Sequence, residues 1–198
     1  TQIHETIRTH IERERALYPQ GIKVLSLFFI DHVDNYRVYN ANGYDLGEYA
    51  KMFEEEYSKV LQEMQPTFFD ESYLQYISSI EVNKTHQGYF SRDKKGNFIN
   101  CKQERGTTNS DDVDAYSLIM KDKEALLSLD KKVKGSDVRF IFSHSALKEG
   151  WDNPNVFQIC TLKNSDNETK KRQEVGRGMR LCVNQQGERQ DEDLLGSA

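Results

Sequence analysis

The sequence predicts a three-layer α/β domain with a mostly parallel sheet. Nearly continuous apolar runs at 24–30, 138–142 and 156–162 are typical of strands that are buried on both faces, as in parallel sheets. Amphipathic stretches with a 3.6-residue period stand before and between these runs. Strands that alternate with helices favour a sheet covered by helices on both faces. At 198 residues the chain is long enough for one core with room for an insertion.

The N-terminal half contains the clearest helical patterns. Isoleucines recur at a spacing of four from Ile3 to Ile11 among charged residues, so we expect an amphipathic helix that ends before Pro19. Apolar residues with a helical period predict a second helix over residues 45–65. Asp45 is a residue type that can cap the N-terminus of that helix.

The middle of the chain changes character. A short helix is expected over 70–78, and residues 81–111 then lose the helical period. A Gly-containing turn at Gly96 between two short apolar stretches predicts a β-hairpin, which we interpret as part of an insertion that projects from the main fold. Helical spacing returns over 114–130, and a last strand is expected at 181–183.

These elements suggest one domain over residues 1–184 that includes the insertion at 81–111. The polar stretch 185–198 is expected to be a disordered tail or boundary segment. The sequence begins with Thr1 rather than Met, which suggests a fragment.

The composition excludes several classes of protein. The net charge of -5 and a charged fraction of 30% predict a soluble chain, and no apolar run approaches the ~20 residues that span a bilayer. No signal-peptide pattern is visible at the N-terminus. The three cysteines lack metal-ligand spacing, so no metal site is predicted and a reducing, cytoplasmic compartment fits best. Cys160 is expected to be a buried thiol.

The most informative motif is the octet 173–180, which reads Q-x-x-G-R-G-x-R. On a helix, Gln173, Arg177 and Arg180 would share one face, because they are spaced at i, i+4 and i+7. A planar amide and two guanidinium groups on one face suit the phosphates of a nucleotide. Gly176 would let a ligand approach closely. The alternative interpretation is an ordinary solvated helix end.

A second motif precedes the octet. Residues 139–160 read as a strand, a polar turn with Gly150 and Asp152 in a Gly-x-Asp pattern, an Asn-Pro turn and another apolar strand. The polar turn also carries small hydroxyls and a lysine that suit contacts with DNA phosphates, or that serve only as loop polar groups: Ser143, Ser145 and Lys148. In order and spacing, the two segments resemble motifs V and VI of superfamily-two helicases.

Missing motifs indicate which part of such a motor the chain resembles. No G-x-x-x-x-G-K-[ST] phosphate loop and no Walker B carboxylate motif occurs, and no G-x-G-x-x-G opens a helix, which disfavours a dinucleotide-binding domain. Superfamily-two motors carry the phosphate loop and metal site on a first RecA-like domain and motifs IV to VI on a second, with ATP between them. The chain resembles the second domain alone. Mg²⁺ would then be bound mainly by the first domain in cis.

The helicase resemblance also implies roles for individual residues. Of Arg177 and Arg180, one would act as an arginine finger on the γ-phosphate and the other as its supporting phosphate contact, while Gln173 would orient water or phosphate. Gly150, Asp152 and Gly176 would belong to the ATP site, where Asp152 would accept a hydrogen bond from the ribose or couple to motif VI.

Three further segments narrow the helicase resemblance to one family. Residues 24–31, 87–96 and 147–156 together resemble the Res subunit of type III restriction-modification systems. That family is an ATP-dependent endonuclease that acts on double-stranded DNA with a methyltransferase (Mod) subunit, and its nuclease domain lies further toward the C-terminus. The chain alone is therefore expected to be inactive. Two alternatives stay open: another superfamily-two translocase or helicase, and a nucleotide-free α/β interaction module.

Overall fold

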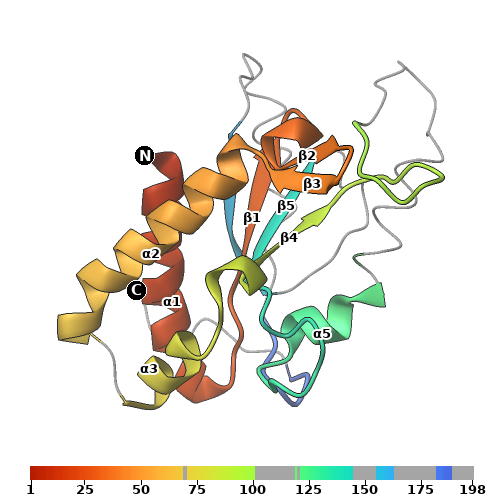
Figure 1. The fold of residues 1–198 in the computed structure, drawn as a ribbon. Helices are drawn as coiled ribbons and strands as arrows, with labels where there is room; N and C mark the ends of the chain where they lie inside the picture. The colour runs from red at the N-terminus through yellow and green to blue at the C-terminus, as the bar shows by residue number, and fades with distance from the viewer. Residues whose placement is uncertain (69–70, 101–118, 120, 145–154, 163–181, 189–198) are drawn as a thin grey trace, which may run out of the picture.

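The computed structural model describes residues 1–68, 71–100, 119, 121–144, 155–162 and 182–188. Its centre is a four-stranded sheet in the order β4-β5-β1-β6, in which every described pairing is parallel (Figure 1). The strands are β1 (Leu25–Ile30), β4 (His86–Tyr89), β5 (Phe140–His144) and β6 (Val156–Thr161). The predicted α/β class with a parallel sheet is confirmed.

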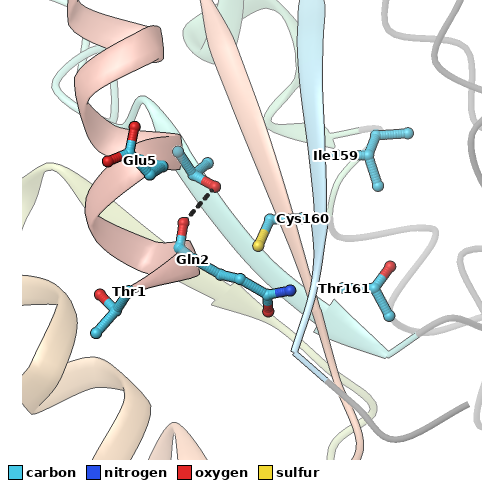
Figure 2. A pocket seen from close by; sticks show the side chains of 7 residues that line it. Thr1, Gln2, Glu5, Ile159, Cys160 and Thr161 are labelled. Atoms are coloured by element: carbon cyan, nitrogen blue, oxygen red, sulfur yellow. Dashed lines mark hydrogen bonds between the residues drawn. The ribbon is translucent and has the colours of Figure 1, made fainter.

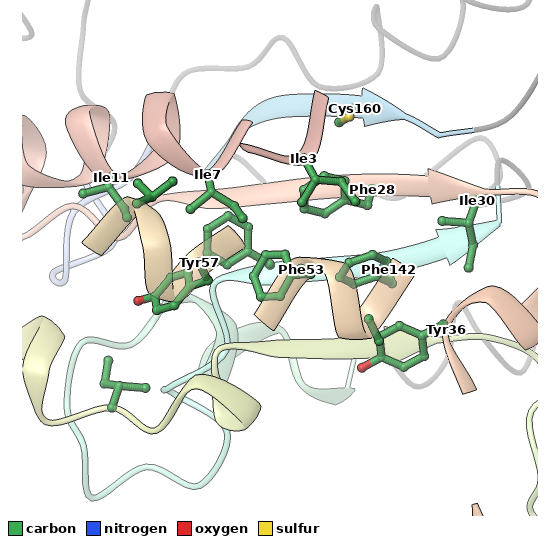
Figure 3. Packing of buried hydrophobic residues seen from close by; sticks show 14 of the residues in the cluster. Ile3, Ile7, Ile11, Phe28, Ile30, Tyr36, Phe53, Tyr57, Phe142 and Cys160 are labelled. Atoms are coloured by element: carbon green, nitrogen blue, oxygen red, sulfur yellow. The ribbon is translucent and has the colours of Figure 1, made fainter. Parts of the chain in front are cut away.

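Helices cover both faces of this sheet. On one face lie α1 (Gln2–Leu17), α2 (Glu48–Phe68) and α3 (Glu71–Ser78), and on the other lies α5 (Lys123–Leu127). Side chains of β1 alternate between the two layers: Phe28 packs with the α1 and α2 residues, and Leu27 packs with Leu126 of α5. Figure 3 shows Ile7 of α1 and Phe53 of α2 meeting Phe28 in the larger core. This is the three-layer arrangement that the alternating strands and helices predicted.

Smaller elements complete the described fold. Three short 3-10 helices, η1 (Tyr18–Gln20), η2 (Val33–Asn35) and η3 (Val82–Lys84), connect larger elements. An antiparallel hairpin of β2 (Arg37–Asn40) and β3 (Gly43–Leu46) forms a separate two-stranded sheet. None of the helices in the described ranges combines the length and the hydropathy that crossing a membrane would require.

The apolar periods located most elements correctly, but the predicted cap of α2 was wrong. Asp45 lies in β3 of the hairpin, where its Oδ2 accepts a hydrogen bond from Asn40 Nδ2 at 2.7 Å. The helix begins at Glu48, and its first turn is closed by Lys51 N–H donating to the Gly47 carbonyl at 3.0 Å. A tight hairpin directly before the helix therefore takes the residues that the apolar pattern had assigned to its first turn.

The interpretation of 81–111 as a projecting insertion was wrong for its first part. Strand β4 pairs with β5 from His86↔Phe140 to Tyr89↔Ser143, so it belongs to the central sheet. The hairpin expected after it is present as a tight turn, with Gly96 at φ 85 and an antiparallel bridge between Arg92 and Phe98. Residues 101–111 lie outside the described residues.

Two further expectations needed correction near the other end of the chain. Within the described part of 114–130, helix α5 ends at Leu127, because Ser128 is extended. Cys182 and Val183 are not part of a named strand of the four-stranded sheet. Instead, the Asn155 side chain binds the Val183 backbone twice, at 2.9 Å to its N–H and 3.0 Å to its carbonyl.

A buried charged cluster joins α1 to the start of β5. Arg139 Nη1 donates to Glu14 Oε2 at 2.6 Å, and the Tyr73 hydroxyl donates to the same oxygen at 2.7 Å. The Arg139 guanidinium also donates to the Tyr57 hydroxyl of α2. His10, one helical turn before Glu14, shares a hydrogen bond of 2.8 Å with Ser26 of β1. These bonds tie three helices and two strands together at the amino-terminal edge of the sheet.

Candidate functional site

The predicted motifs follow strands whose carboxyl ends share one edge of the sheet. Because the strands are parallel, β1, β4, β5 and β6 all end on the same side. In open α/β sheets, ligands bind outside this carboxyl edge. The predicted motif V segment begins directly after β5, and the stretch that leads to the octet begins shortly after β6.

Most of the predicted site residues lie outside the described residues, so the structure does not test their roles. They are Ser145, Lys148, Gly150, Asp152, Gln173, Gly176, Arg177 and Arg180. Nothing in the described geometry brings them together or separates them.

Ser143 is the predicted site residue that the structure does place, and its predicted location was wrong. It lies in β5 rather than in the loop that follows, and its side chain is buried. Its Oγ donates to the Tyr89 carbonyl of β4 at 2.7 Å. A buried hydroxyl that already donates to a backbone oxygen is a contact between strands, so we expect it to make no contact with a DNA phosphate.

The surroundings of the carboxyl edge are held in place by bonds between elements. The Tyr49 hydroxyl of α2 donates to the Leu162 carbonyl just past β6 at 3.1 Å. The Val33 N–H, just past β1, donates to Asn100 Oδ1 at 2.7 Å. Asp31 and His32, which follow β1 directly, are exposed. These two hydrogen bonds hold the segments just past β1 and β6 at the carboxyl edge of the sheet.

A hollow runs along β4, and we refer to it as the β4 groove. It has a volume of about 820 Å³. The hairpin supplies Arg37 and Tyr44, the segment around β4 supplies Lys84 and Arg92, and the loop before β5 supplies further residues: Lys131, Val133, Lys134, Gly135, Asp137 and Val138. Phe98 and Tyr36 also line it, and the Tyr39 hydroxyl accepts a hydrogen bond from the Phe98 N–H at 2.8 Å. That bond fixes the hairpin to the turn after β4.

Positive charge dominates the β4 groove. Its lining contains two arginines and three lysines against the carboxylates of Glu54 and Asp137. Glu54 is itself engaged, because its Oε1 lies 3.1 Å from Nε2 of His86. Burial lowers the pKa of His86, although the neighbouring Glu54 carboxylate raises it in part. The sequence analysis missed this groove, because its cations come from separate segments of the chain: Lys131 and Lys134 stand in a short basic run, but Arg37, Lys84 and Arg92 lie far from that run in sequence.

Another hollow, of about 540 Å³, lies between the start of α1 and the edge strand β6 (Figure 2). Glu5 and Thr6 line it on the helix, and Ile159, Cys160 and Thr161 line it on the strand. The expected burial of the Cys160 thiol is confirmed, and burial raises its pKa. Among the described residues, no three His, Cys, Asp or Glu side chains are grouped so that they could hold a metal ion.

The described fold is a parallel α/β sheet covered by helices on both faces, and comparison with known proteins adds particular relatives. The chain is 40% identical over 188 residues to the Res subunit of the type III restriction-modification enzyme EcoP15I of Escherichia coli, covering 92% of this chain and 17% of that protein. It is 38% identical over 189 residues to the EcoPI Res subunit of Escherichia phage P1, covering 93% and 18%.

A third relative, the StyLTI Res subunit of Salmonella typhimurium, is 32% identical over 206 residues, covering 94% of this chain and 19% of that protein. No protein-family model matches the chain. The chain therefore spans less than a fifth of the length of these relatives, and the resemblance to type III Res subunits is confirmed over nearly all of the chain.

Proposed function

We propose that the chain is the second RecA-like domain of a type III Res subunit and supplies motifs V and VI for ATP hydrolysis stimulated by DNA. The observation that carries this proposal is the identity of 38–40% to two Res subunits over more than nine tenths of the chain. The parallel sheet supports it, because β5 and β6 lead toward the two motif segments from one carboxyl edge.

In this function the motif residues act on the phosphates of ATP. Arg177 or Arg180 neutralises charge on the γ-phosphoryl group as the bond to the leaving group breaks, and the other arginine holds the same phosphates. Gln173 orients the attacking water, and Gly150, Asp152 and Gly176 line the nucleotide site. Arginine and glutamine side chains present N–H donors, which fit phosphate oxygens rather than a cation. Mg²⁺, which would offset charge on the β- and γ-phosphates, is therefore assigned to the first RecA-like domain in cis.

The same proposal assigns partners and a compartment. The partners are double-stranded DNA and a methyltransferase (Mod) subunit, with Lys148 and Ser145 in contact with the DNA backbone. The compartment is the cytoplasm, where Cys160 and Cys182, which are free and buried, stay reduced.

Phosphate release tests this proposal at two levels. The natural full-length protein, with its Mod subunit and duplex DNA, should hydrolyse ATP faster than the same preparation without DNA. The 198-residue chain by itself should remain at background with and without DNA, because it contains no phosphate loop. Steady turnover by the chain alone, or no ATP hydrolysis by the full-length protein, would contradict the proposal.

A further inference from the structure

We propose that the β4 groove binds the phosphate backbone of DNA, independently of base sequence. This inference rests on the proposed function as a DNA-acting subunit and deepens it, since it names a surface for DNA along the side of β4. The residues that line the groove come from the hairpin, from β4 and its flanking segments, from Leu46 and Glu54, and from the loop before β5.

The charge of the groove is the first argument. The chain has a net charge of -5, yet five cationic side chains and only two carboxylates line this hollow. Arg92 and Lys134 are exposed; the first follows β4 and the second lies in the loop before β5. Lys84 is bound to Glu81 at 2.7 Å in an exposed pair, which a phosphate can replace at little cost. A local concentration of cations on an acidic body is the electrostatic pattern expected for a polyanion site.

Arg37 provides the second argument. Its guanidinium carbon lies 3.9 Å from the ring centroid of Tyr44 and 4.6 Å from that of Phe98. Its Nε is buried and has no hydrogen-bond partner among the described residues. Stacking on aromatic rings fixes the plane of a guanidinium and leaves its N–H groups for a bidentate bond to phosphate. A fixed arginine with an unused donor in a basic groove is therefore prepared for an anionic ligand.

Exposed apolar side chains distinguish DNA from a free phosphate. The large hydrophobic residues that are exposed among those described are Val38, Tyr44 and Val133, at 43%, 53% and 38%, and the last two line the groove. Sugars and base faces need such contacts in addition to cations, and grooves that follow a nucleic-acid strand combine basic and aromatic side chains.

The size and the polar residues of the groove agree with a backbone contact. The four residues of β4 extend about 13 Å, which corresponds to about four nucleotides of one strand at ~3.4 Å of axial rise each. Asn83 and Gln87 are the lining amides, too few to read several base edges. We therefore assign the groove to the backbone rather than to sequence recognition.

Equilibrium binding without ATP tests the proposal. The natural full-length protein is titrated into labelled duplex DNA that lacks any recognition site, and into a single strand of the same length, between about 50 and 200 mM salt. The test variant is Arg92→Ala with Lys134→Ala. The matched control is Arg8→Ala with Lys59→Ala, because both of these cations lie in exposed ion pairs within a helix, to Glu12 and Glu56, and line neither side of the groove.

The groove variant should lose at least about tenfold in affinity at low salt, and its salt slope on duplex DNA should fall by about two units. The control should leave both quantities unchanged. An unchanged slope in the groove variant would overturn the proposal, as would a loss of binding to a poly-glutamate peptide with no loss on DNA, since that result would assign the groove to an acidic protein.

A correctly folded variant with Arg37→Ala should also bind DNA more weakly, with a salt slope lower by about one unit because it removes one cation, and it tests the groove at a third segment of the chain. The experiment also separates this inference from the proposed function. Binding is measured without ATP, so a failure of the motif VI arginines would leave the groove result intact. Conversely, if the groove variants keep both normal DNA binding and normal ATP turnover, only the proposal for the β4 groove is refuted, and the proposed function is unaffected.

Discussion

Glu14 and Arg139 form an ion pair in which both side chains are 0% exposed, with Oε2 and Nη1 at 2.6 Å. The pair joins α1 to the residue before β5, positions that are far apart in sequence. Two ions in the interior lose their hydration, and only their mutual attraction and further hydrogen bonds offset that loss. Tyr73 and Tyr57 provide such bonds, one to each partner.

Removing one partner of this pair should destabilise the fold strongly. We expect Arg139→Met to lower the free energy of unfolding by about 3–5 kcal/mol, because it leaves the Glu14 carboxylate buried without its counter-ion. The double variant with Glu14→Leu should recover a large part of that loss. Urea unfolding followed by circular dichroism measures both, with Arg8→Ala, from an exposed pair, as a control that changes stability by less than about 1 kcal/mol. Equal stability of Arg139→Met and the unmodified chain would show that the pair contributes nothing.

The same pair predicts how stability depends on acid. Burial alone would raise the pKa of Glu14, but the Arg139 guanidinium, the nearby His10 imidazole and the hydrogen bond from Tyr73 outweigh it and lower the pKa from 4.5 to about 2. Because the folded-state pKa lies below the unfolded value, this contribution is present above about pH 4.5 and is lost as the pH falls toward 2. Urea midpoints should fall steeply in this range, and less steeply in the double variant Glu14→Leu with Arg139→Met. If the urea midpoints of the unmodified chain and of the double variant fall equally steeply with acid, the acid dependence does not come from the Glu14–Arg139 pair.

Lys23 should produce a dependence of the same sign, but at neutral to basic pH. Burial lowers its pKa from 10.5 to about 7, although the Glu14 carboxylate raises it in part. Unfolded Lys23 keeps its proton up to about 10.5, so the unfolded state binds more protons above pH 7 and stability should rise with pH. The buried thiols of Cys160 and Cys182, whose pKa burial raises above 9.0, oppose this rise at higher pH. We expect Lys23→Met to flatten the stability profile between about pH 7 and 9. A profile that keeps its slope in this variant would point to another group.

Gly88 in β4 should not tolerate a side chain. A Cβ at this position would lie 2.5 Å from Cε1 of Tyr36 and 2.7 Å from Cε2 of Phe90. Overpacking of this kind costs about 1–3 kcal/mol, so Gly88→Ala should lower the free energy of unfolding by that amount. Gln87→Ala, at the neighbouring half-buried position, is the matched control and should change stability much less. Equal effects of the two substitutions would mean that the Tyr36 ring moves aside freely.

Ser143 should matter for stability and not for DNA. Ser143→Ala removes the 2.7 Å hydrogen bond to the Tyr89 carbonyl, which joins β5 to β4, and should cost about 1 kcal/mol. Binding of the full-length protein to duplex DNA should be unchanged, whereas Lys148→Ala should weaken binding to all sequences alike and reduce the salt slope by about one unit. Weaker DNA binding by a stable Ser143→Ala variant would restore the sequence-based assignment.

The sequence predicted the elements whose signal is local. The apolar runs of β1, β5 and β6 and the helical period of α1 and α2 needed no knowledge of their neighbours. Strand β4 has the sequence His-Gln-Gly-Tyr, which contains no apolar run, and its place in the sheet depends on β5 beside it and on the Tyr36 ring over Gly88. A pattern in one segment cannot reveal such contacts.

The candidate sites divide in the same way. Short motifs identified the relatives of the chain, and their proposed ATP residues stay predictions because they lie outside the described residues. The β4 groove could not be predicted, since Arg37, Arg92 and Lys134 meet only after the hairpin, the turn and the loop have folded around β4.

The central claim is that the octet supplies an arginine finger, and one measurement tests it most directly. ATP turnover and ATP affinity are determined for the full-length protein with duplex DNA, before and after Arg177→Ala, with circular dichroism as a check of folding. A finger stabilises the transition state far more than the bound substrate. Turnover should therefore fall by about 10³ or more while ATP affinity changes much less, and Arg177→Lys should restore little, because an ammonium cannot form the bidentate contact. Turnover close to that of the unmodified protein would show that the arginines only cover a solvated helix face.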